Sequence, residues 1–72
     1  MKRTAEDARF RPAPGDSFVY HEGPRSSENV LYVIGDRVWF TARYDNPALD
    51  LECHESVEAW SSHPDAGVWV PA

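Results

Sequence analysis

The residue types best suited to chemistry lie between positions 51 and 63 of the chain. They are the single cysteine, its neighbouring histidine, two glutamates and a second histidine: Cys53, His54, Glu55, Glu58 and His63. A structural zinc site needs four ligands, paired at C-x2–4-C or H-x3–5-H spacing, and this stretch contains no such pair. A thiol nucleophile needs cationic neighbours that favour the thiolate, whereas the neighbours of Cys53 are acidic. The spacing therefore predicts no metal site, no cofactor and no enzymatic activity.

Apolar and polar residues alternate over positions 49–54, which predicts a short half-buried strand. Successive side chains of a strand point to opposite faces. Cys53 is therefore expected to face inward as a small hydrophobic residue, and His54 to face outward. A short helix is predicted near residues 55–62, where Val57 and Trp60 share the face that packs on the sheet.

The charge is unevenly distributed in a chain of 72 residues with a net charge of -5. Residues 1–11 carry four bases and two acids, whereas residues 12–72 carry three bases and ten acids. Nucleic-acid binding depends on Lys and Arg at phosphates, so the acidic part argues against a nucleic-acid partner and favours a protein with a basic surface. One cysteine forms no internal disulfide, which favours the cytoplasm, and no apolar run is long enough to span a membrane.

The chain divides into a flexible N-terminal arm, residues 1–16, with a turn of helix near residues 4–9, and one β-rich domain, residues 17–72. Within the domain we predict strands at residues 17–22, 29–34, 37–44, 49–54 and 68–70. A loop is expected from Gly23 to Ser27. Residues 64–67 are expected to turn the chain into the last strand.

The strongest local signal is Gly35-Asp36 between two apolar runs, which predicts a type II′ hairpin. Its register pairs Tyr32 with Trp39, Leu31 with Phe40 and Glu28 with Arg43. One sheet face is then wholly apolar and is expected to be the core: Leu31, Val33, Val38, Phe40 and Ala42. The other face carries Val30, Tyr32, Ile34, Trp39 and Thr41.

Five short strands and one short helix predict a mainly β (α+β) fold, either a small SH3-like five-stranded barrel or a three-stranded antiparallel sheet with one packed helix. The succession GDSFVYHE, ENVLYVIGDRVWFTARYD, SVEAW and GVWVPA over residues 15–71 resembles small stand-alone proteins of bacteriophages and other mobile elements. That resemblance implies a barrel-like meander followed by a helix and a final strand. Some small acidic proteins of this kind inhibit host defence, including CRISPR complexes, by occupying a protein surface.

Two surfaces are candidate binding sites. The first is an aromatic and arginine face of residue types that are enriched in interface hot spots: Tyr32, Ile34, Arg37, Trp39 and Arg43. It is alternatively a second small core covered by another part of the chain. The second is a row of carboxylates that could imitate a phosphate backbone or only keep the protein in solution: Asp45, Asp50, Glu52, Glu55 and Glu58.

The sequence thus predicts a protein-binding module that inhibits a host nucleic-acid-handling complex by covering its surface. A second copy of the chain, bound through the Tyr32/Trp39 face, is another expected partner. The alternative is a nucleic-acid-binding SH3-like module that uses the aromatic and arginine face and the basic N-terminal arm.

Overall fold

The computed structural model describes residues 2–62 and 67–70. Its elements, in chain order, are α1 (Ala5–Phe10), β1 (Ser17–Val19), β2 (Arg25–Ile34), β3 (Arg37–Tyr44), a 3-10 turn η1 (Pro47–Leu49), β4 (Leu51–Ser56), α2 (Val57–Ser61) and β5 (Val68–Val70). His63 and most of the turn predicted at residues 64–67 lie outside the described ranges. The end of the predicted domain after Val70 lies outside them as well.

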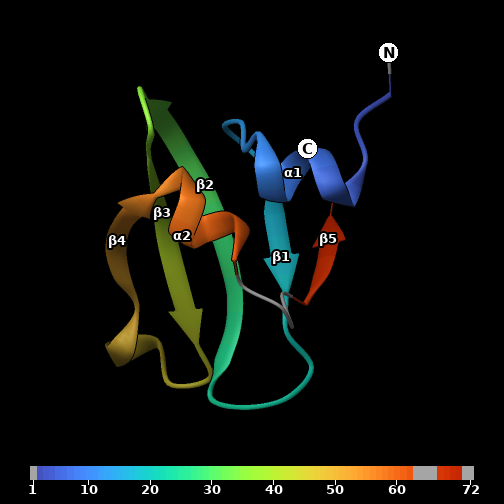
Figure 1. The fold of residues 1–72 in the computed structure, drawn as a ribbon. Coiled ribbons are helices and arrows are strands. Elements are labelled where there is room, and N and C mark those ends of the chain that lie inside the picture. The colour runs from blue at the N-terminus through green and yellow to red at the C-terminus, as the bar shows by residue number, and fades with distance from the viewer. Residues whose placement is uncertain (1, 63–66, 71–72) are drawn as a thin grey trace.

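The five strands form one antiparallel sheet in the order β4-β3-β2-β1-β5. The sheet is open, with β4 and β5 at its two edges, and both helices lie over the same face (Figure 1). The mainly β, α+β prediction is confirmed at this level. The SH3-like barrel is not confirmed. The alternative of three strands with one helix is wrong, because the described residues form five strands and two α-helices.

The strand bounds differ from the predicted ones mainly around the first loop. β1 ends at Val19, and β2 begins at Arg25, inside the predicted loop. The predicted loop begins β2 because its residues pair with strands on both sides. Ser27, for example, lies opposite Val19 of β1 and Arg43 of β3. Near the other end of the domain, β4 begins at Leu51 and not at the predicted residue 49, which belongs to η1. The strand continues to Ser56, so α2 is shorter than predicted.

The β2–β3 hairpin has the predicted turn. Gly35, the first central residue of the turn, has a φ of 60°, as a type II′ turn requires. Asp36, the second, does not have a positive φ, because glycines alone have one in the described ranges. Ile34 pairs with Arg37, and Tyr32 with Trp39, in the predicted register.

Beyond Tyr32 the register changes at a β-bulge, so the predicted core face is wrong for Leu31, whereas Val33 packs against the core as predicted. Val30 rather than Leu31 lies opposite Phe40, and Glu28 lies opposite Ala42 rather than Arg43. One extra residue in a strand moves every following side chain to the other face. Leu31 is accordingly 39% exposed, whereas Val30 is 3% and Glu28 0% exposed.

The core lies between the inner face of the sheet and the two helices. The buried apolar residues are Ala8, Phe18, Val30, Val38, Phe40, Ala42 and Trp60. Trp60, at the centre, is fully buried, and its ring meets those of Phe18 and Phe40 at centroid distances of 5.8 and 5.0 Å. The predicted packing of α2 on the sheet through Trp60 is confirmed.

The N-terminal segment packs on the domain instead of extending from it as the predicted arm. α1 begins with a capping box in which the Thr4 hydroxyl accepts from the Asp7 N–H, and the Asp7 carboxylate accepts from the Thr4 N–H. This second bond lowers the pKa of Asp7. Ala8 and Arg9 are buried, and the Ala8 carbonyl accepts from Trp60 Nε1–H at 3.0 Å. Burial of these two residues makes α1 part of the core.

Asp16 is, like Glu28, a buried carboxylate. It joins segments near both ends of the chain to the start of β1. It accepts hydrogen bonds from the Ala13 N–H at 3.0 Å and from Trp69 Nε1–H at 3.3 Å, and it forms an ion pair with Arg3. Because Asp16 is almost fully buried, these donors replace the water that the carboxylate loses on folding.

Candidate protein-binding surface

The face of the sheet opposite the helices is exposed, and we call it the outer face. Since Val38, Phe40 and Ala42 point into the core, the alternate residues of β3 and their cross-strand neighbours point outward. The outer face of the β2–β3–β4 part includes Tyr32, Ile34, Arg37, Trp39, Thr41, Arg43, Glu52 and His54. All five residues predicted for the aromatic and arginine face are therefore brought together.

Three aromatic rings form a row across this face, one from each strand. Tyr32 and Trp39 are stacked, with ring centroids 5.2 Å apart and an interplanar angle of 24°. Trp39 and His54 follow at 5.5 Å and 30°. Each pair is a direct cross-strand pair, so the backbone of the sheet holds the row in place without a partner.

An arginine lies beside the row. The Arg37 guanidinium is 2.9 Å from Nδ1 of His54. Arginine has only donors, so Nδ1 accepts, and a neutral ring carries its proton on Nε2. Arg43 lies further along β3 and is exposed, and Ile34, next to the turn, is 63% exposed. The outer face thus presents flat apolar surface next to guanidinium groups.

The predicted row of five carboxylates is divided among several surfaces. Glu52 lies on the outer face opposite Thr41, whereas Glu55 falls on the inner side of β4 and is half-buried. Glu58 lies on α2. Asp45 is exposed after β3, and the Asp50 carboxylate accepts from the Tyr44 N–H at 2.8 Å. The alternation of side chains along β4 separates residues that are close in sequence.

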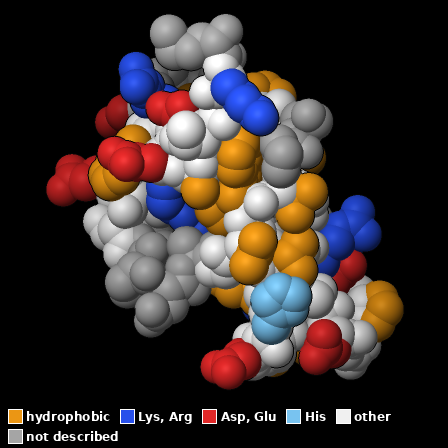
Figure 2. Space-filling view, turned by 90° about the vertical axis from the view of Figure 1, so that its right-hand side faces the viewer, with side chains coloured by type: hydrophobic (Ala, Val, Ile, Leu, Met, Phe, Trp, Pro, Cys, Tyr) orange, Lys and Arg blue, Asp and Glu red, His pale blue; other side chains and the backbone are white. Residues whose placement is uncertain are grey.

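A second apolar area lies on the β5 side of the sheet. Figure 2 views the molecule from this side and shows hydrophobic side chains in a band down it. Val68 and Val70 of β5 are 55% and 43% exposed. They lie opposite Val19 and Ser17 of β1, while the pair Phe18 and Trp69 points inward.

The residues that first suggested chemistry do not form a reactive centre in the described ranges. Cys53 lies opposite Phe40 and packs against the core, as predicted, and His54 points to the other face. No group of three or more His, Cys, Asp or Glu residues among those described is placed to hold a metal ion. An open hollow of about 550 Å3 beside the β1–β2 loop is lined by Tyr20, His21, Glu22, Gly23 and Gly67, and none of these residues is fully buried.

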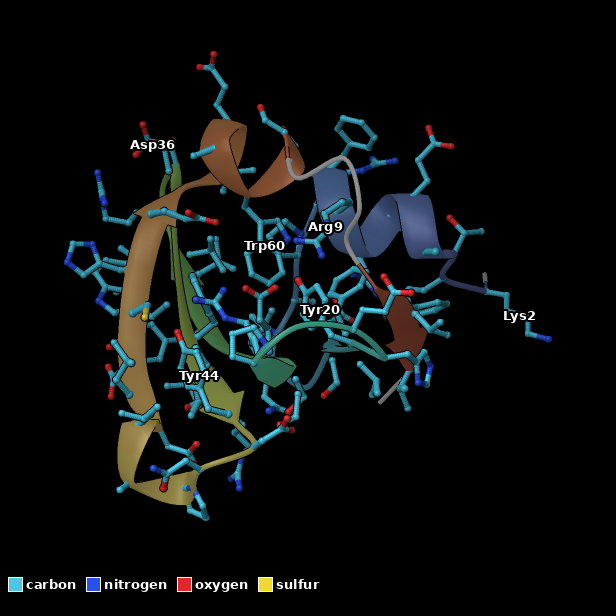
Figure 3. The ribbon with its side chains drawn as sticks, turned by 90° about the horizontal axis from the view of Figure 1, so that it is seen from below. Lys2, Arg9, Tyr20, Asp36, Tyr44 and Trp60 are labelled. Atoms are coloured by element: carbon cyan, nitrogen blue, oxygen red, sulfur yellow. The ribbon has the colours of Figure 1, made fainter. Side chains whose placement is uncertain are left out.

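Behind the outer face lies a buried charge network that the sequence did not suggest. The Glu28 carboxylate accepts from Arg25 at 2.6 Å and from the Tyr20 hydroxyl at 2.5 Å, and Arg9 lies 3.8 Å away. Arg25 also donates to the Tyr44 hydroxyl at 2.9 Å. Figure 3 shows Arg9, Tyr20 and Tyr44 turned toward one another in the interior of the molecule. Together these contacts join α1, β2 and β3.

Aromatic rings surround the arginines of this network. The Arg9 guanidinium lies 3.7 Å from the ring centroid of Phe18 and 4.5 Å from that of Trp60, and such contacts are favourable for a desolvated cation. Although burial lowers the pKa of Arg25, the hydrogen bond with Tyr44 and the charge of Glu28 raise it overall. Arg25 therefore stays charged, and together with Arg9 it balances the Glu28 carboxylate.

Tyr20 is expected to ionise only in strongly alkaline solution. Burial, together with the hydrogen bond to the Glu28 carboxylate, raises the pKa of Tyr20 from 10.0 to about 12. The unfolded chain loses this proton first, so stability is unaffected below about pH 10 and decreases as the pH rises toward 12. The measurement is the phenolate absorbance of the wild type minus that of Tyr20→Phe. A difference titration centred at pH 10 would contradict the expected hydrogen bond.

No family model matches the chain, and no curated protein and no solved structure matches it. None of the helices in residues 2–62 and 67–70 has the length and apolar character needed to cross a membrane.

Proposed function

We propose that this protein is a non-enzymatic binding module that acts by covering a surface of another protein with its outer face. The observation that carries the proposal is the row Tyr32–Trp39–His54 with Arg37 beside it. Both helices pack on the other face of the sheet, which leaves this row accessible.

The composition and rigidity of the row support this role. Tyr, Trp and Arg dominate the binding energy of protein interfaces. Tyr32 and Ile34 are exposed although both are large and apolar, and rings already stacked across three strands lose little freedom on binding. An aromatic surface of this kind provides affinity without a conformational change.

In its more specific form, the proposal is that the partner is a host nucleic-acid-handling complex and that the protein inhibits it, as an anti-CRISPR-like product of a phage or mobile element acting in the host cytoplasm. The net charge of -5 supports a partner with a basic surface, because opposite charges accelerate encounter. The proposal includes the likeness to mobile-element proteins and to small SH3-like barrels. The consecutive antiparallel pairing of β1 through β4 supports the likeness to a barrel-like meander.

A second candidate function is the binding of single-stranded nucleic acid. Exposed aromatic rings stack with bases, and arginines contact the phosphates. Arg37 and Arg43 both lie on the outer face, where Glu52 is the one acidic residue among the β2, β3 and β4 positions described. This local charge favours the second function, whereas the charge of the whole chain opposes it.

Affinity capture from a bacterial lysate tests the proposal. The wild type is expected to retain a stoichiometric protein complex, and Trp39→Ala to weaken it by about 30-fold or more, since a central hot spot contributes at least about 2 kcal/mol. Leu49→Ala is the control, because Leu49 is an exposed apolar residue that lies on η1 and not on the outer face. Circular dichroism checks that both variants fold.

Two outcomes would contradict the proposal. In one, Trp39→Ala retains the complex as well as Leu49→Ala does. In the other, the wild type shifts single-stranded DNA or RNA at physiological salt and Trp39→Ala abolishes the shift, which would establish the second function instead.

A further inference from the structure

The free edge of β4 presents backbone groups that no described residue occupies. β4 is six residues long and stands at the outside of the sheet with β3 on one side only (Figure 1). In an antiparallel strand, alternate residues direct their N–H and C=O groups to opposite sides. Half of the backbone groups of β4 therefore point away from the sheet.

The hydrogen bond at the end of β4 shows which residues these are. The Val57 N–H donates to the Asp36 carbonyl at 2.6 Å, on the β3 side. By alternation, Glu55 and Cys53 also direct their backbone groups to β3, and Glu52 and His54 direct theirs outward. An unpaired edge of this kind is a template for another strand.

The charges around this edge indicate what kind of strand it accepts. Residues 44–62 contain no Lys or Arg, and Asp50, Glu52, Glu55 and Glu58 lie on or beside β4. Pairing of β4 with the β4 of a second copy would bring two such sets of carboxylates together, which is unfavourable. A basic strand meets opposite charge instead.

The edge is also polarised along its length. Glu52 lies near the start of β4, whereas His54, with Arg37 bonded to its ring, lies toward the end. A side chain placed next to Glu52 on the outer face is favoured if it is basic. One placed next to His54 meets the end of the aromatic row and is favoured if it is apolar or aromatic.

We propose that β4 accepts an extended, lysine- or arginine-containing segment of a partner protein as a sixth strand of the sheet. The segment donates to and accepts from the backbone of Glu52 and His54, and its basic side chain pairs with the Glu52 carboxylate. Six residues at about 3.4 Å each give an edge about 20 Å long. This inference rests on the proposed function, because it names the chemistry of the partner and the place where it binds beside the aromatic row.

The probe is an extended peptide with lysine and valine two residues apart, so that lysine lies next to Glu52 and valine next to His54 on the same face. Two matched peptides are measured beside it. The first has glutamate in place of lysine. The second is N-methylated on every backbone nitrogen, so that it keeps the charge but cannot donate. We expect the lysine peptide to bind at millimolar concentration or below, and each matched peptide to bind at least about tenfold more weakly, a loss of about 1.4 kcal/mol.

Amide hydrogen exchange locates the binding. The amides of Glu52 and His54 are expected to gain protection when the lysine peptide is present, and those of Cys53 and Glu55, already bonded to β3, to change less. Glu52→Gln is expected to weaken binding several-fold. Glu22→Gln, an equal change of charge at an exposed site in the β1–β2 loop, is the control and is expected to leave binding unchanged.

Three results would overturn the inference. They are no binding of the lysine peptide, equal binding of its N-methylated form, and no protection at Glu52 and His54. If any of these occurs while Trp39→Ala still abolishes the captured complex, the outer face remains the binding surface and only the added strand is excluded. If the peptide binds as expected and Trp39→Ala has no effect on capture, the proposed use of the outer face is wrong.

Discussion

Replacing Glu28 with alanine is expected to destabilise the fold by about 3–5 kcal/mol. Glu28 is fully buried and balances Arg9, which is buried as well. Without the carboxylate, a desolvated guanidinium loses its ion pair and Tyr20 loses its acceptor. A domain of this size has little stability to lose, so Glu28→Ala should be largely unfolded at room temperature by circular dichroism and urea titration.

A double variant separates the cost of burying a charge from a simple packing defect. Arg9→Met combined with Glu28→Leu removes the buried pair and fills its space with apolar atoms. Buried ion pairs replaced in this way are often neutral or stabilising, so the double variant should recover much of the stability that Glu28→Ala loses. A double variant less stable than Glu28→Ala would show that the network contributes more than mutual compensation of charge.

Trp60→Ala is expected to cost about 3–5 kcal/mol as well, but through a cavity. The Trp60 ring lies among Phe18, Phe40 and the Arg9 guanidinium, and its N–H donates to the Ala8 carbonyl. Its loss empties the contact between the helices and the sheet. The variant should lose its cooperative thermal transition and cause α1 to detach.

The same change on the outer face is the matched control. Trp39→Ala removes an equal side chain from a half-exposed position, where solvent can fill the space, and should cost about 1 kcal/mol, the size of one cross-strand aromatic pair. Equal destabilisation by the two variants would contradict the assignment of Trp60 to the core and Trp39 to the surface.

Local sequence signals were sufficient for the hairpin and for the location of most strands. Gly35 with its positive φ and the apolar runs on each side set the register near the turn. The bulge was missed because no glycine or proline marks it. The bulge places Glu28 in the interior, where it pairs with Arg9 and Arg25, and residue 9 is far from residue 28 in the sequence.

The candidate site was predicted in part for the same reason. The facing of Tyr32 and Trp39 follows from the hairpin alone, and the structure stacks the two rings. His54 completes the row only because β4 pairs with β3 in one particular register, and a sequence pattern does not set the register of strands joined by a loop. The same register carries Glu55 to the inner side and divides the expected acidic row.

The packing of α1 was not evident because half of its six residues are charged and its one large apolar residue, Phe10, is exposed. A helix usually reveals its buried face by an apolar stripe, whereas α1 buries one alanine and one arginine. The stem and the guanidinium of Arg9 fill a space lined by Phe18 and Trp60. A residue type that normally indicates a surface thus supplies part of the core.

The contacts of α1 also bear on when the protein can fold. The bonds of Arg9 and Ala8 to Trp60 connect residues that are separated by 51 and 52 positions in the sequence. The bond between Asp16 and Trp69 connects residues separated by 53 positions. The residues of α1 and Asp16 therefore remain without these contacts until α2 and β5 have been synthesised. Closing such long loops is the slow step for chains dominated by distant contacts. The domain is accordingly expected to gain its structure in one late event, once β5 is present, rather than strand by strand as the chain emerges.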